Sequence, residues 1–216
     1  MIFYSIKSKL IVSFLLMSIV PLAVVGVISY ISSYKAIEEK VSVYFQQISI
    51  QTAGKLDNML RNIEDISLQI VSSGELQDLL AQAEGADEQQ RRLIKEQVEK
   101  KLGNIVSARN DIIGVNILMR NADNIFISGE TLVNPEKYKE SEFYRLAEKP
   151  EMKLIWTGAH KNENAMATYT YIVTLTRNIK LLETGRNIAT LVIGVKEFAI
   201  ADTYSYIDLG PTGFVF

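Results

Sequence analysis

An apolar run without a charged residue extends from Leu10 to Ile31 near the start of the chain. At about 1.5 Å per residue, its roughly 22 residues would form a helix about 33 Å long, enough to cross a hydrocarbon core about 30 Å thick. A signal peptide has a shorter apolar core and ends in a small-residue cleavage site, for which Val27-Ile28-Ser29-Tyr30 is poorly suited. A buried core helix of this length is hard to enclose in so small a chain. We therefore predict an uncleaved transmembrane helix over 10–31.

The charges that flank this run indicate its orientation. Lys7 and Lys9 precede it without any acidic residue, whereas Lys35 is followed closely by Glu38 and Glu39. The positive-inside rule then places residues 1–9 in the cytoplasm and the rest of the chain outside. We expect a single-pass protein of the plasma membrane, with the lipid bilayer as one partner.

A second helical pattern follows the run and predicts a long amphipathic stalk helix over 32–72, with one apolar stripe. Such a stripe can cover the core of its own domain, or it can pack against a second copy and form a homodimer. Both alternatives fit a stripe whose apolar residues are three or four positions apart. The stripe consists of Ile37, Val41, Tyr44, Ile48, Thr52, Leu56, Met59, Ile63, Ile66 and Ile70.

Two shorter helices are predicted next. Ser72-Ser73-Gly74 interrupts the stripe, and 75–83 has the composition of a short helix. A further amphipathic helix begins after Asp87, a good N-cap residue that is followed by an acid in the first turn. Its apolar side comprises Leu93, Ile94, Val98, Leu102, Ile105 and Val106.

Beyond residue 110 the period of the apolar residues changes from near 3.6 to 2, which indicates strands. Strands are expected over 112–119 and 125–128, joined as a hairpin, and then over 154–157, 167–176 and 189–195. Helices are expected over 136–149, where Pro150 ends the pattern, and over 198–206. Helices gathered on an antiparallel sheet make an α+β domain.

Composition excludes several classes of function. The net charge of −2 gives no basic field for nucleic acid, and the chain has no cysteine for disulfides or thiolate metal sites. Its only histidine, His160, would have to serve any zinc site or Ser-His-Asp triad alone. Phosphate-loop, zinc-protease and nucleophile-elbow motifs are absent from the sequence. We expect no catalysis, no metal and no cofactor.

Several stretches resemble bacterial membrane receptors with an extracellular double Cache sensor, which is a PAS-like fold. They are SIKSKLIVSFLLMSIVPLAVVGVISY at the start, the long helix, KLIWTGAH, and IATLVIGVKEFAIADTYSYIDLGPTGFVF at the end. The sequence looks most like the sensor histidine kinases of two-component systems, while chemoreceptors and cyclic-dinucleotide enzymes share this input architecture. The resemblance implies a membrane-distal sensor module over 73–208 that holds a small ligand between its sheet and the helix and loops on one face.

The same resemblance implies that 209–216 opens a second, membrane-proximal module. An unfinished strand leaves its backbone groups unpaired, so we expect a fragment or a truncated reading frame that stops before an output domain.

One departure from the resemblance bears on the ligand. Relatives that bind amino acids carry an Arg followed by Trp-Tyr before the pocket, and an Asp at the end of a later strand. This chain has Ser141-Glu142-Phe143-Tyr144 at the first place and Gly194 at the second. We therefore do not expect a free amino acid as ligand.

Seven residues are candidates for ligand binding. Tyr144 and Arg145 can stack on and pair with an anionic ligand, unless they are a core tyrosine and a solvated arginine. Trp156 and His160 fall where the resemblance puts the pocket wall, although a tryptophan is more often a core anchor.

The other three candidates follow from one strand. Tyr169 and Tyr171 share one strand face with Val173 and Leu175, while Thr170, Ile172, Thr174 and Thr176 share the other. One of these faces must meet the core and the other can line a pocket. Arg177 at the strand end can bind a carboxylate or phosphate, or simply be exposed.

The expected function is the extracellular ligand-sensing input region of a transmembrane receptor, of the histidine kinase, chemoreceptor or cyclic-dinucleotide kind. A membrane-tethered module that docks a partner protein is an alternative of another class, and an inert remnant of a truncated gene is a third.

Overall fold

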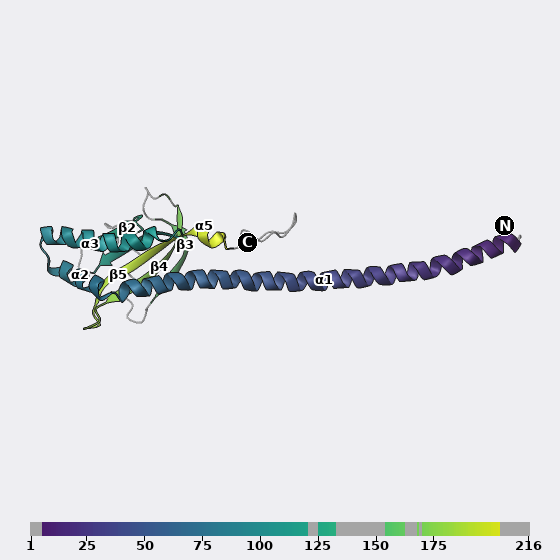
Figure 1. Ribbon diagram of the computed structural model, residues 1–216. Coiled ribbons are helices and arrows are strands. Elements are labelled where there is room, and N and C mark those ends of the chain that lie inside the picture. Colours follow the sequence, from purple (N-terminus) through teal and green to yellow (C-terminus); the bar gives the residue numbers. More distant parts are fainter. Residues whose placement is uncertain (1–5, 121–124, 133–153, 163–167, 169, 204–216) are drawn as a thin grey trace. The chain divides into compact units, whose positions relative to one another are not determined.

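The computed structural model describes residues 6–120, 125–132, 154–162, 168 and 170–203. They form helices α1 (Ile6–Val71), α2 (Gly74–Gly85) and α3 (Glu88–Ser107), strands β1 (Ile112–Met119), β2 (Ile125–Gly129), β3 (Ile155–Lys161), β4 (Tyr171–Lys180) and β5 (Asn187–Lys196), and helix α5 (Glu197–Ala201) (Figure 1). The chain divides into two compact units, Met1–Ala53 and Gly54–Phe216. We call the second the sensor unit, after the resemblance that the sequence shows.

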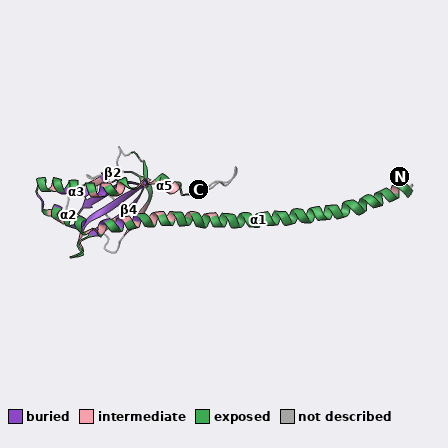
Figure 2. Cartoon of the chain, in the orientation of Figure 1, coloured by how far each residue is buried: buried purple, intermediate pink, exposed green. Residues whose placement is uncertain are grey.

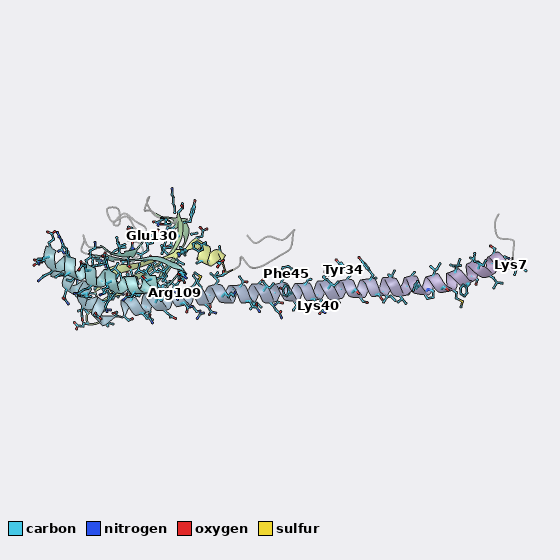
Figure 3. All side chains as sticks on the ribbon, turned by 45° about the horizontal axis from the view of Figure 1, so that its top comes forward. Lys7, Tyr34, Lys40, Phe45, Arg109 and Glu130 are labelled. Carbon is cyan, nitrogen blue, oxygen red and sulfur yellow. The ribbon has the colours of Figure 1, made fainter. Side chains whose placement is uncertain are left out.

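The first unit consists of a single helical stretch of α1 in its described part. It contains the apolar run, and it is the only helix among the described residues that is long and apolar enough to cross a membrane. The side chains of Tyr34, Lys40 and Phe45 are exposed along it (Figure 3). Tyr30 and Tyr34 stack with their ring centroids 6.5 Å apart at the end of the run.

The sensor unit contains a five-stranded sheet in the order β2-β1-β5-β4-β3, in which every neighbouring pair is antiparallel. One sheet face packs against α2, α3 and the last turns of α1. Buried residues of this core include Ile63 and Ile70 of α1 and Leu80 of α2, each at most 3% exposed. Strands β1 and β5 at the sheet centre are almost wholly buried (Figure 2). The α+β fold predicted from the sequence is confirmed.

The stripe on α1 separates into two parts. Ile63 and Ile70 lie in the core of the sensor unit, whereas Ile37 and Tyr44 in the first unit are 63% and 61% exposed. Covering the unit's own core therefore accounts for the end of the stripe. Dimer formation through the remainder stays a prediction.

Helix boundaries follow local chemistry. Helix α1 ends at Val71, and Ser73 caps α2 by accepting a hydrogen bond from the amide of Leu76. Asp87 caps α3 by accepting a hydrogen bond from the Gln90 amide at 2.8 Å, as predicted. Helix α1 is continuous from Ile6 to Val71, so the predicted transmembrane segment 10–31 continues without a break into the predicted stalk helix 32–72.

Two strand predictions need correction. Strand β4 extends to Lys180 and begins at Tyr171, four residues later at each end than expected. Its polar end stays in the sheet because β5 pairs with it as far as Asn187. Strand β3 continues past the predicted end at Thr157 to Lys161 through a register shift.

Helix α5 begins at Glu197, and its predicted end near 206 lies outside the described residues. The predicted helix 136–149 and the segment 209–216 also lie outside them.

Candidate functional site

The two faces of the sheet differ in chemistry. In β4, Val173 and Leu175 belong to the core shared with the helices. Side chains alternate along a strand, so Thr174 and Thr176 lie on the opposite face. They are nonetheless buried, with 0% and 2% of their surface exposed. This second face therefore combines burial with polar side chains.

Strand register gathers further polar residues on this face. Thr157 of β3 pairs directly with Thr174, and Thr176 is linked through Val192 to Asn116 of β1. We call this surface the threonine face; it comprises Asn116, Thr157, Thr174, Thr176 and Thr190.

Three hydroxyls of the threonine face lack partners. The Oγ1 atoms of Thr157, Thr174 and Thr176 are buried and form no hydrogen bond within the part of the chain that the structure describes. Burying a hydroxyl without a partner is unfavourable. A ligand that accepts or donates hydrogen bonds here would relieve this penalty.

A segment after β2 crosses this face and is held by Asn116. Gly129 has a positive φ of 77°, and a Cβ there would lie 2.4 Å from the carbonyl oxygen of Ile113, so the turn requires glycine. The Glu130 amide then donates to that same carbonyl at 3.0 Å. Asn116 donates from Nδ2 to the Glu130 carbonyl at 3.0 Å and accepts from the Leu132 amide at 2.8 Å. Residues 130–132 are thereby fixed above β1.

Leu132 fills the space beside Gly194. A Cβ added at Gly194 would lie 2.4 Å from Leu132 Cδ2 and 3.0 Å from Ile113 Cγ1. Leu132 itself is fully buried. The space beside Gly194 is therefore filled by a leucine side chain that reaches in from another segment.

Glu130 brings a carboxylate to the same region (Figure 3). Its Oε1 accepts a hydrogen bond from the Thr168 amide at 3.1 Å. Its Oε2 is buried and has no hydrogen-bond partner among the described residues. The site thus combines one negative charge with several uncharged hydroxyl and amide groups.

Solved structures that match this fold include extracellular sensor and ligand-binding domains. The extracellular domain of a histidine kinase, vpHK1S-Z8, is matched with a TM-score of 0.60 and 12% identity over 80% of this chain and 64% of that one. A domain of a sensory box/GGDEF family protein from Vibrio parahaemolyticus is matched with a TM-score of 0.51 and 13% identity over 69% of this chain and 57% of that one. The chain therefore spans less than two thirds of the length of these two structures.

The ligand-binding domain of the Pseudomonas aeruginosa amino-acid chemoreceptor PctC, solved in complex with GABA, is matched with a TM-score of 0.52. The identity is 14%, over 74% of this chain and 66% of that one. The fold is that of bacterial sensor domains. No protein-family model matches the sequence, and no curated protein matches it either.

Two predicted site residues, Trp156 and Tyr171, alternate onto the helix side of the sheet. Trp156 pairs with Leu175, and its indole Nε1 donates to Glu64 Oε1 of α1 at 2.8 Å. Tyr171 lies on the same strand face as Val173, and 54% of its surface is exposed. Their role in ligand binding stays a prediction.

His160, in contrast, is opposite Ile172 in the register and so falls on the threonine face. Its Nδ1 lies 2.9 Å from the Gly158 carbonyl oxygen. Tyr144, Arg145 and Tyr169 lie outside the described residues.

Arg177 lines a different pocket, on the helix side of the sheet. Burial lowers the pKa of its guanidinium, while the nearby charge of Glu64 acts to raise it. Gln77 closes one wall by donating to the Val71 carbonyl and accepting from the Leu182 amide. The pocket has a volume of about 450 Å³ and is lined by Leu68, Val71, Ser72, Gln77, Arg177, Asn178, Lys180 and Leu182.

Sequence reasoning placed Thr174 and Thr176 on a strand face that could line a pocket, but it named neither them nor Glu130 as candidate site residues. Its candidates were aromatic and basic, whereas the threonine face relies on small polar groups and on Glu130. One signal was present: Thr174 and Thr176 alternate with apolar residues in the first half of β4. Glu130 and Asn116 had no such signal, because their roles depend on the crossing of residues 130–132 over β1.

Proposed function

We propose that this chain is the membrane anchor and the extracellular, ligand-sensing input region of a bacterial transmembrane receptor. The observation that carries the proposal is the threonine face, where buried hydroxyls without partners lie within a sensor-domain fold. Such groups favour a bound small molecule over a permanently closed, apolar interior.

Membrane anchoring is supported by α1. Its apolar run is exposed along its whole length and would be unfavourable in water. Tyr30 and Tyr34 stand at the end of the run, where amphipathic rings commonly lie at the membrane interface. With Lys7 and Lys9 on the cytoplasmic side, the sensor unit would be outside the cell.

Helix α1 offers a route for the signal. The same helix contains the apolar run and the residues that pack in the sensor core, and Glu64 on it accepts the hydrogen bond from Trp156. A ligand that binds one packing of the sheet more tightly than another would shift the population between them. We propose an output of the sensor histidine kinase kind; a chemoreceptor or a cyclic-dinucleotide enzyme is the second candidate.

The absence of native cysteine makes the topology directly testable. Lys161 is exposed in the sensor unit and Lys7 precedes the apolar run. In intact bacteria, a membrane-impermeant maleimide should label Lys161→Cys and should not label Lys7→Cys until the cells are opened. Labelling of Lys7→Cys alone in intact cells would contradict the proposed orientation.

Ligand sensing is tested by melting the full chain in nanodiscs against small organic ions, sugars and peptides. A ligand that binds only the folded state raises the melting temperature in proportion to its occupancy. No shift across the whole set would argue for a module that docks a protein instead.

A further inference from the structure

The carboxylate of Glu130 is held from two sides. Its backbone amide is tied to β1 through the Ile113 carbonyl, and its side chain accepts a hydrogen bond from the Thr168 amide, just before β4. Glu130 therefore connects the β1 side of the sheet to the segment that enters β4. Its charge is fixed at the end of the threonine face where Gly114 and Gly194 pair.

One oxygen of this carboxylate is left without a partner. Oε2 is buried, and neither a hydrogen bond nor an ion pair to Glu130 Oε2 occurs among the described residues. A buried carboxylate is unfavourable unless it is paired with a cation or with hydrogen-bond donors. In this position, the missing partner has to be a donor that the described part of the chain does not supply.

Neighbouring groups limit what that partner can be. Asn116 has its amide nitrogen and oxygen occupied by Glu130 and Leu132, and Leu132 fills the space at Gly194. Thr157 and Thr174 contribute uncharged hydroxyls to this face. Glu130 supplies its negative charge, while Lys196, which lies on the same face by register, has its Nζ 5.5 Å from the centre of the Phe198 ring.

We infer that Glu130 binds a positively charged amine of the ligand through Oε2, while the hydroxyls of Thr157 and Thr174 bind its remaining polar groups. The inference rests on the proposed function, because it assumes that the threonine face holds the sensed molecule. Charge-assisted hydrogen bonds between an ammonium group and a carboxylate are stronger than neutral ones. The ligand class is accordingly a cationic amine rather than a neutral polyol or a dicarboxylate.

The first test uses three compounds that share a four-carbon chain: putrescine, butanediol and succinate. Their effect on the melting temperature of the full chain in nanodiscs is measured for the wild type and for Glu130→Gln. Putrescine should stabilise the wild type, and Glu130→Gln should weaken its apparent affinity by about tenfold or more. Glu183→Gln, which removes an exposed acid in the turn before β5, is the matched control and should bind as the wild type does.

Glu130→Asp keeps the charge on a shorter side chain and should retain part of the putrescine effect. Stabilisation by succinate or butanediol but not by putrescine would overturn the inference and leave ligand sensing intact. Putrescine binding that is equal in the wild type and Glu130→Gln would also overturn it.

A second test needs no ligand. Replacing Glu130, whose Oε2 is buried without a hydrogen bond among the described residues, by glutamine should raise the melting temperature of the ligand-free chain by a few degrees, because residues retained for binding are often unfavourable for stability. Glu183→Gln should leave it unchanged. If Glu130→Gln instead lowers the melting temperature of the ligand-free chain, Glu130 has a structural role and the inference fails. This outcome is independent of whether any of the three compounds binds.

Discussion

At the scale of single residues, Gly194 shows how a distant side chain determines what a position can do. Any Cβ at Gly194 meets Leu132, whose side chain reaches it from the segment after β2. The packing of Leu132 against Gly194 thus leaves no room for a larger side chain at this point of the sheet.

This pairing predicts a coupled pair of substitutions. Gly194→Ala should destabilise the chain by about 1–3 kcal/mol through overpacking, and Leu132→Ala by about 2–5 kcal/mol through a cavity. The double variant should cost clearly less than the sum, because the removed leucine makes room for the added methyl group. Chemical denaturation of the full chain in detergent measures all three. Gly158→Ala, where an added Cβ meets nothing within 4 Å, is the control; a Gly194→Ala cost equal to it would contradict the packing.

At the scale of elements, a side-chain hydrogen bond connects β3 to α1. Trp156 donates to Glu64 across a sequence separation of 92 residues. The bond lies on the helix side of the sheet, so its direct partner is the helix rather than the threonine face. A change in the position of β3 would therefore displace the hydrogen-bond donor to Glu64 on α1.

Trp156→Phe should lower the free energy of unfolding by about 1–3 kcal/mol, because it removes a donor to a charged acceptor. Glu64→Gln retains an acceptor oxygen and should cost less. A double-mutant cycle between the two isolates the part of the hydrogen bond that depends on the carboxylate charge from the loss of indole surface. Glu96→Gln, an exposed change on α3, should be neutral. Additive effects of Trp156→Phe and Glu64→Gln would show that the charge of Glu64 contributes nothing to this hydrogen bond.

At the scale of the whole molecule, one chain combines an exposed apolar run with a folded sensor unit. The two units are distinct in their contacts, and α1 contributes residues to both. The run has no buried residue, so nothing within its own unit shields it from water. A lipid environment is the physical explanation that this composition favours.

Leu16→Arg combined with Val25→Arg should move the chain out of the membrane fraction. Each arginine near the centre of a spanning helix costs about 3 kcal/mol for insertion. Alkaline carbonate extraction followed by immunoblotting measures the shift. Gln47→Arg, on the same helix beyond the apolar run, should stay with the membranes. Equal retention of both variants would contradict a spanning segment at 10–31.

The periodicity of the sequence by itself determined the element types, because periods of 3.6 and 2 are local properties of a chain that buries one side. Strand β1 and the Asp87 cap were predicted at the positions where they occur. Tertiary structure alone decided which face of β4 would join the helices. Alternation separates Thr174 from Leu175 but cannot say which of them meets the core.

The polar site also depended on tertiary structure. Glu130 and Leu132 act on β1 and β5 only because Gly129 turns the chain back over them and Asn116 holds it there. These contacts join residues that are far apart in sequence, so no local pattern encodes them.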